Sequence, residues 1–274
     1  MWSQTPPSTG GDTLIVYEPD TLPPRGERFH LNSFGVNFRD GSHQFFDGYN
    51  YQILNANARE GLPVFLDWPD FSGAVVLPTY WQVEGHAAWV DTSRGIKVRA
   101  GLTYMQRKDS MQTGSDFARY DTIYGRNASE FGHFYGFTAA AMKQSRKFWG
   151  FLRLYGGAEV EAMVSPRSDI YFLLYAYDIG EERIVDLNEF EAEGKPRFNL
   201  YASALIGLET VFWKHFGFFL EVKSGLGGQF VLREQTFGMA KNAYHLGLNW
   251  YLWDYKRKPM QRREIIIPAP PDPE

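Results

Sequence analysis

The feature that most constrains this chain is an alternation of side-chain character over residues 215–233. The even positions are apolar almost throughout: Phe216, Phe218, Leu220, Val222, Leu226, Phe230 and Leu232. Most odd positions are charged, polar or glycine: His215, Gly217, Glu221, Lys223, Gly225, Gly227, Gln229 and Arg233. Successive residues of a strand point to opposite faces, so this pattern predicts one long β-strand between two different environments. In a transmembrane barrel the apolar face meets lipid and the other face lines the lumen.

The flanking segments 199–212 and 244–253 alternate in the same way, and the second is aromatic-rich, with Tyr244, Trp250, Tyr251 and Trp253. Over residues 41–254 this pattern resembles the small outer-membrane β-barrels of Gram-negative bacteria, of the OmpA, OmpX and OmpW type, whose last strand usually ends in an aromatic residue. No catalytic or ligand motif contributes to the resemblance. It implies an integral outer-membrane protein in contact with lipid and lipopolysaccharide, with both termini in the periplasm.

The predicted fold is all-β, a transmembrane antiparallel up-and-down β-barrel of about eight strands. The strands are expected within 43–56, 80–91, 96–107, 130–143, 148–161, 199–212, 215–233 and 244–253. Tight turns at 92–95, 144–146 and 213–215 alternate with long segments at 57–77, 108–129, 163–197 and 234–242, which are interpreted as loops. The first strand alternates imperfectly. Replacing it by Ile170–Tyr177 also gives eight strands, and counting both gives a larger barrel if one further strand exists.

Composition excludes several other classes. The 274-residue chain has 17% aromatic residues and 27 glycines, yet no apolar run approaches the ~20 residues of a transmembrane helix. There is no cysteine, so disulfides and thiolate sites are excluded, and the net charge of −4 argues against a nucleic-acid partner. The six histidines are scattered without metal-ligand spacing. We therefore expect no cofactor and no metal.

Two tails flank the predicted barrel of residues 41–254. Residues 1–40 are rich in proline and are expected to form an extended arm, with strand character at Thr13–Tyr17. Residues 255–274 are basic and then proline-rich, and form a predicted periplasmic tail. Residues 1–11 lack the basic and apolar regions of a secretory signal. Because an outer-membrane protein is exported, we expect the sequence to describe a processed or re-engineered chain.

Charged residues at inward positions are the strongest polar constellation. The interior of an eight-stranded barrel is just wide enough for its own side chains, and buried charges there must be paired. The sequence therefore predicts an ionic network that closes the lumen, formed by Glu84, Arg99, Arg153, Glu159, Glu209, Glu221 and Lys223, with His86, Lys97, Glu161 and His245 at the same parity.

These residues lead to a hypothesis of function: a non-enzymatic anchor, scaffold or accessory subunit of an outer-membrane complex. Partner proteins of the outer membrane or periplasm are expected at Ile170, Phe172, Leu174 and Tyr177 and at the tail residues Ile265, Ile266 and Ile267. The tail could add to a partner's sheet edge.

Three alternatives stay open. A lipid-modifying hydrolase or acyltransferase could use Ser203, Glu209 and His245, which share the inward parity. A small channel would need an open lumen. A soluble lipocalin-like carrier would place the apolar face inward, which the same alternation allows.

Overall fold

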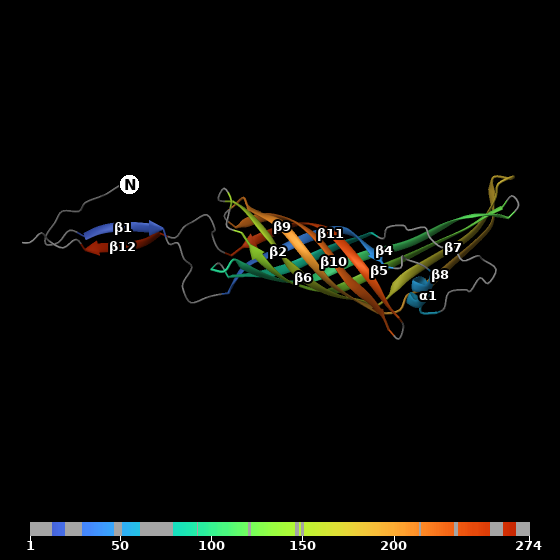
Figure 1. The fold of residues 1–274 in the computed structure, drawn as a ribbon, viewed down its shortest axis with the longest axis horizontal. Coiled ribbons are helices and arrows are strands. Elements are labelled where there is room, and N and C mark those ends of the chain that lie inside the picture. The colour runs from blue at the N-terminus through green and yellow to red at the C-terminus, as the bar shows by residue number, and fades with distance from the viewer. Residues whose placement is uncertain are drawn as a thin grey trace, which may run out of the picture.

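The structure is a computed structural model, and it describes most of the chain outside the tails and a few connections. The described residues are 13–19, 29–46, 51–60, 79–91, 93–119, 122–145, 148, 151–213, 215–232, 235–252 and 260–266. Eight long antiparallel strands dominate it (Figure 1). They are β2 (His30–Phe45), β3 (Thr79–Asp91), β4 (Ile96–Arg119), β5 (Thr122–Gln144), β6 (Leu152–Ser165), β9 (Arg197–Val211), β10 (Phe216–Val231) and β11 (Thr236–Tyr251).

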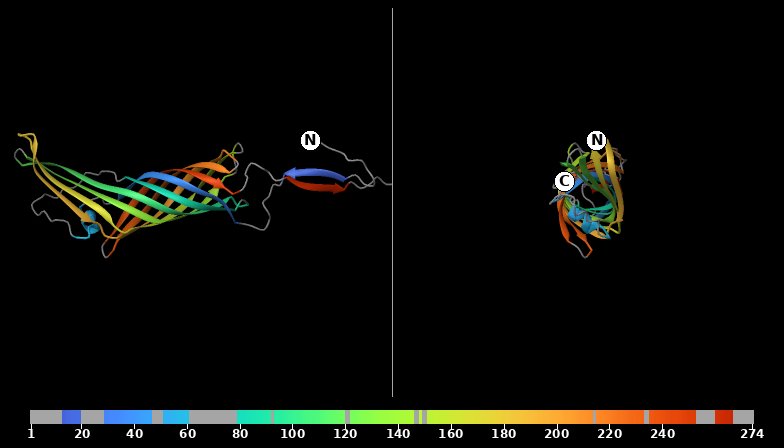
Figure 2. Two further views of the ribbon diagram at one scale, coloured as in Figure 1. Left: turned by 180° about the vertical axis from the view of Figure 1, so that it is seen from behind. Right: turned by 90° about the vertical axis from the view of Figure 1, so that its right-hand side faces the viewer.

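These strands close into a barrel. Their order is β4-β3-β2-β11-β10-β9-β6-β5, and pairing of β4 with β5 completes the ring. Every neighbouring pair is antiparallel, and most neighbours are consecutive along the chain. Figure 2 shows this wall from behind and along the length of the molecule. The prediction of an eight-stranded up-and-down barrel is confirmed.

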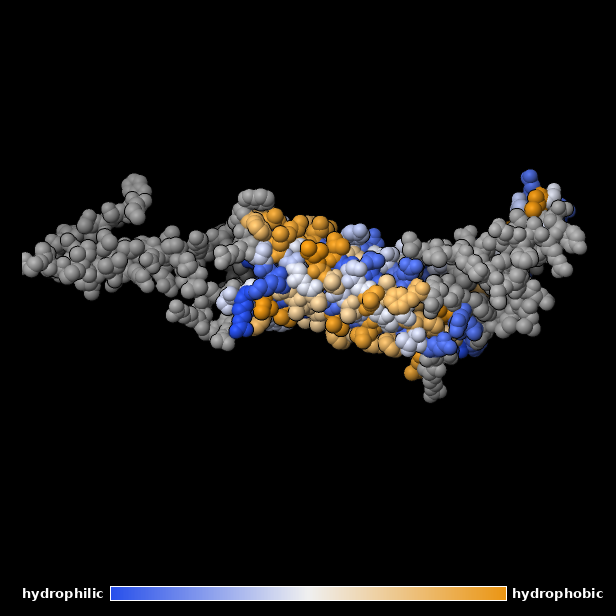
Figure 3. Space-filling model, viewed as in Figure 1, coloured by the Kyte–Doolittle hydropathy of each residue, from blue (hydrophilic) through white to orange (hydrophobic). Residues whose placement is uncertain are grey.

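The barrel is apolar outside and charged inside. Leu220, Val222, Leu246 and Leu248 are exposed on the outer wall, whereas Glu221 and Lys223 are buried. Apolar residues cover much of the wall in the space-filling view (Figure 3). A water-soluble carrier would have the opposite distribution, so this is a transmembrane barrel of the small outer-membrane type. No helix within the described residues is long and apolar enough to span a bilayer.

Aromatic side chains gather toward both ends of the outer wall, where girdles are expected. On the side of the longer connections, Trp81 lies against Phe38 and Tyr104, with ring centroids 6.5 and 5.4 Å away. Near the opposite end, Trp213 contacts Phe212 and Phe216. Trp253, the last residue of the predicted final strand, lies outside the described residues.

The first barrel strand differs from the prediction. It begins at His30, inside the segment 1–40 that was interpreted as an arm, and ends at Phe45. The predicted strand 43–56 is wrong, because Tyr51–Asn57 forms the helix α1. The proline-rich character of the preceding residues obscured a regular alternation of exposed Phe34, Val36 and Phe38 with buried inward residues.

The long segments 108–129 and 163–197 are not loops. The strands β4 and β5 continue beyond the barrel and pair with each other as far as Arg119 and Thr122. Two further strands, β7 (Ser168–Asp178) and β8 (Arg183–Glu193), join them in the order β4-β5-β7-β8. We call this four-stranded sheet the extension. It projects from the end of the barrel opposite β1 and β12 (Figure 1).

Helix α1 packs between the barrel and the extension. Its Leu54, with the following Ala58, contacts a buried cluster from the extension: Ala128, Ile170, Phe172 and Leu174. The adjacent Ile53 packs against a second cluster from the barrel: Phe45, Tyr201, Val231, Phe237 and Met239. Ile53 and Leu54 are adjacent in the helix but project in different directions, so each packs against a different cluster.

The predicted partner surface at residues 170–177 is therefore corrected. Ile170, Phe172 and Leu174 are nearly inaccessible because α1 and Phe190 cover them, and Tyr177 is half-buried in β7. The apolar run 170–177 shows no alternation, and it was therefore interpreted as an exposed surface for a partner protein. The run is instead the intramolecular core of the extension.

The two tails meet each other. The strand β1 (Thr13–Pro19) pairs antiparallel with β12 (Met260–Ile266) in a separate two-stranded sheet. The register sets Ile265 opposite Leu14 and Ile266 opposite Thr13. Ile267 lies outside the described residues. The tails start from β2 and β11, which are neighbours in the barrel, and this brings them together.

The turn between β3 and β4 was predicted at 92–95, and the structure describes residues 93–95 of it as a turn. Gly95 adopts a left-handed φ of 64°, a conformation that glycine accepts at little cost. The Asp91 carboxylate accepts hydrogen bonds from the Ser93 hydroxyl at 2.5 Å and from the backbone N–H groups of Ser93 and Arg94.

Candidate functional site

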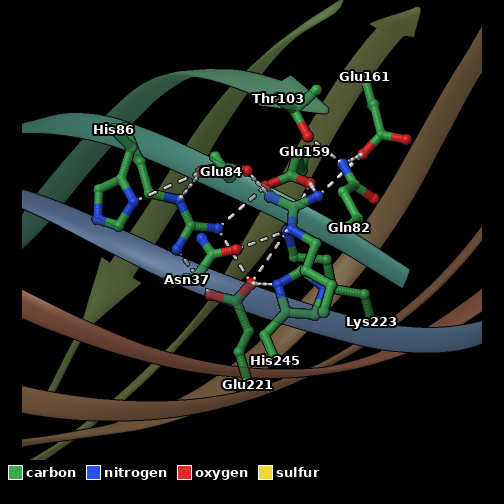
Figure 4. Close-up of polar contacts among 12 residues, drawn as sticks. Asn37, Gln82, Glu84, His86, Thr103, Glu159, Glu161, Glu221, Lys223 and His245 are labelled. Carbon is green, nitrogen blue, oxygen red and sulfur yellow. Dashed lines mark hydrogen bonds and ion pairs between the residues drawn. The ribbon is translucent and has the colours of Figure 1, made fainter. Parts of the chain in front are cut away.

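The middle of the lumen holds four carboxylates and four basic groups, all nearly inaccessible to solvent. The carboxylates are Glu84, Glu159, Glu161 and Glu221, and the basic residues are Arg39, Arg99, Lys223 and Lys241. Six different strands contribute them, each from its inward parity. Figure 4 shows the four carboxylates and Lys223 converging inside the barrel. We call these eight residues the central network.

Two arginines hold the central network together. Arg39 Nη1 lies 2.8 Å from Glu161 and 3.2 Å from Glu159, and its other Nη contacts Glu84. Arg99 binds Glu221 through both Nη atoms, at 3.1 and 3.0 Å, and Glu159 at 3.0 Å. Forked contacts of this kind are stronger and more directional than single ones. The arginines therefore connect opposite walls of the barrel.

The lysines neutralise the remaining charge. Lys223 lies 3.0 Å from Glu221 and also contacts Glu159. Lys241 contacts Glu161 and donates to Gln82 Oε1 at 3.2 Å. Four acidic side chains thus face four basic ones, and all eight residues are buried. Such a network fixes the packing of the lumen, because an unpaired member would cost several kcal/mol.

A second group lies toward the end of the barrel with the tight turns. Its centre is Glu209, which accepts hydrogen bonds from Lys97 at 2.8 Å, Asn249 at 2.8 Å and Tyr251 at 2.7 Å. Arg153 lies 3.8 Å from Glu209 and is only partly buried, so it is at the margin of this group. Glu209 and Arg153 therefore belong to a different layer from the central network.

A third group closes the other end of the lumen. His43 lies 2.6 Å from Asp109, which also contacts Arg107 Nε at 2.9 Å. Nearby, Arg197 lies 2.6 Å from Glu130. Asn57 of α1 donates to Glu130 at 2.8 Å and accepts from Gln229 at 3.0 Å. Helix α1 is thereby tied to the polar lumen as well as to the apolar clusters.

The sequence-derived set and the structural set overlap in part. The structure brings Glu84, Arg99, Glu159, Glu221 and Lys223 together in the central network and places Glu209 and Arg153 in the layer below. The sequence-derived set lacks Arg39 and Lys241, and it lacks the third group as well. Arg39 shares its parity with Asn37 and His43 in β2, and this alternation was the signal that could have found it.

The candidate hydrolytic triad is not assembled. His245 is opposite Glu221 across β10 and β11, while Ser203 is opposite Gly225. Four residues of register separate the two positions, or about 13 Å along the strands. His245 Nδ1 lies 3.3 Å from Glu221 instead. Among the described residues, no three histidine or acidic side chains are grouped to hold a metal ion.

Comparisons with known proteins give only distant likenesses. No protein-family model and no curated protein matches the chain. Among solved structures, Ail, the attachment invasion locus protein of Yersinia pestis in complex with the heparin analogue sucrose octasulfate, is 9% identical, covering 81% of this chain and 98% of Ail at a TM-score of 0.31. A mutant of the monoaromatic hydrocarbon channel TodX is 8% identical, with 85% and 93% covered and a TM-score of 0.18. Likenesses this weak carry no argument, and the barrel is assigned from the positions of its own side chains.

Proposed function

We propose that the chain is a closed, non-enzymatic anchor in the bacterial outer membrane. The observation that carries this proposal is the central network, in which Arg39 and Arg99 link carboxylates from different walls. A conducting pore needs a continuous aqueous path, whereas the barrel interior here is occupied by paired side chains. The barrel therefore serves to hold the extension and the tails on either side of the bilayer.

The proposed orientation follows the asymmetry of the two barrel ends. The short connections between β3 and β4 and between β9 and β10 lie at the end where the tails leave the barrel. Outer-membrane barrels have short periplasmic turns and longer surface connections. The extension and α1 then face the cell exterior, near lipopolysaccharide, and the tails face the periplasm. Partner proteins of the outer membrane or periplasm contact these appendages, and the chain acts as a scaffold between them.

Planar-bilayer recording tests the closed lumen. We expect the purified chain in a lipid bilayer to show no stepwise current, because the paired side chains of the central network leave no aqueous path. A detergent extract from cells that lack the chain controls for contaminating porins. Reproducible current steps that depend on the added protein would replace the anchor by a channel.

Cysteine labelling tests the orientation. The sequence has no native cysteine, so only the introduced residue can be labelled. We expect Glu182→Cys, in the exposed connection between β7 and β8, to react with a membrane-impermeant maleimide on intact cells. Pro270→Cys in the tail should react only after the outer membrane is opened. The reverse labelling pattern would place the tails outside the cell and refute the proposed orientation.

A further inference from the structure

The two-stranded sheet of β1 and β12, which we call the terminal ribbon, has no sheet neighbour among the described residues. Seven consecutive residue pairs join its strands, the first being Thr13 with Ile266 and the last Pro19 with Met260. A two-stranded sheet alone is marginally stable in water, and a third strand or a packed face is needed for independent stability. The terminal ribbon is therefore incomplete as it stands.

The composition of the terminal ribbon favours completion by another chain. Alternate residues of a strand belong to opposite faces, and both alternate sets of β1 contain apolar residues: Leu14 and Val16 in one, Ile15 and Tyr17 in the other. A ribbon that stayed in water would be expected to be polar on at least one face. The unpaired edges of such a ribbon carry free backbone N–H and C=O groups, and these are templates for pairing with a further strand.

The two edges of the terminal ribbon are not equivalent. The strand β1 ends in Pro19, which has no backbone N–H, whereas β12 contains no proline. The strand β12 includes Arg262 and Arg263 with the single acid Glu264, and it follows the basic residues 256–258. The strand β12 thus has an edge without proline and a sequence with a net positive charge.

We propose that the outer edge of β12 binds an extended acidic segment of a partner protein as a third strand. Main-chain hydrogen bonds would supply affinity and the basic residues would select acidic partners. This inference deepens the proposed function and rests on it only for the periplasmic location of the partner. It also changes the role expected for the isoleucines of the tail, because Ile265 and Ile266 already pair with the chain's own β1.

The test uses the full chain in detergent and fluorescent seven-residue peptides, the length of β12. One peptide alternates valine and glutamate, and its counterpart alternates valine and lysine. Binding is followed by fluorescence anisotropy. We expect the acidic peptide to bind and the basic one to bind about tenfold more weakly or worse, because strand pairing is common to both and charge is not.

Backbone methylation separates strand addition from simple charge attraction. Two further acidic peptides carry N-methyl groups on the odd or on the even residues. Since only alternate N–H groups of an added strand face its neighbour, one methylated peptide should lose binding and the other should keep it. Equal binding of both methylated peptides would overturn the proposal.

A charge reversal locates the site. The double variant Arg262→Glu/Arg263→Glu should bind the acidic peptide at least about tenfold more weakly, whereas Arg59→Glu, on the exposed surface near the extension, should not change binding. Hydrogen exchange at residues 260–266 should slow when the peptide binds the unaltered chain. An unchanged affinity in the double variant, or unchanged exchange, would overturn the proposal. Peptide binding is measured in detergent and does not depend on the orientation of the chain in the membrane. A failure to bind would therefore contradict strand addition but not the proposed anchor. A reversed labelling pattern on cells would contradict the proposed orientation but not strand addition.

Discussion

Replacing Arg39 by methionine is expected to lower the free energy of unfolding by about 3–5 kcal/mol, the usual cost of removing one partner from a buried ion pair. Arg39 contacts Glu84, Glu159 and Glu161. Methionine fills a similar volume but leaves these carboxylates with too little compensating charge. The measurement is urea unfolding of the barrel in lipid vesicles, followed by tryptophan fluorescence.

Two companion variants identify the cause of that loss. Arg59→Met removes an ion pair with Glu193 in which both side chains are about half exposed, so less than about 1 kcal/mol should be lost. Adding Glu84→Gln to Arg39→Met should restore part of the stability, because the basic side chains that remain near Glu84 are more distant: Arg99 at 3.7 Å and His86 at 3.6 Å. Equal losses for Arg39→Met and Arg59→Met would show that the central network is not the element that stabilises the barrel.

The barrel wall was predictable because its two environments impose the same alternation on every strand. Leu220 and Glu221 report opposite faces of β10, and their neighbours Leu246 and His245 repeat the pattern on β11. The inward position of the charged residues was predictable from the same alternation. The partners in each ion pair were not, because they depend on which residues of different strands lie at the same depth in the lumen. Glu209 meets Lys97 rather than the central network for this reason.

The extension could not be predicted because alternation there is weak and its apolar residues are covered by a segment distant in sequence. Ile170 and Phe172 are buried in a cluster that includes Leu54 of α1 and Phe190 of β8. The short break between β6 and β7 also hid the fact that strand structure resumes directly after β6. Pro166, which cannot donate to a ladder, lies in that break, while β5 pairs with β6 on one side of it and with β7 on the other.

Replacing Leu220 by arginine is expected to cost about 2–4 kcal/mol in lipid vesicles, as charged residues do near the middle of the lipid-facing wall of a barrel. Leu220 is 44% exposed and lies between Leu208 and Leu246 on the neighbouring strands, both also exposed. No water reaches such a position when acyl chains surround it. The variant should show a lower urea midpoint and a smaller folded fraction on insertion into vesicles.

Leu187→Arg is the matched control, because Leu187 is 50% exposed but lies on β8 of the extension. If the extension is in water, arginine there should change the free energy of unfolding by no more than about 0.5 kcal/mol. The two leucines have similar solvent exposure in the isolated chain, so only the surrounding medium separates them. Equal small effects at both positions would mean that Leu220 faces water and would refute the membrane assignment. Equal large effects would place the extension in the bilayer as well.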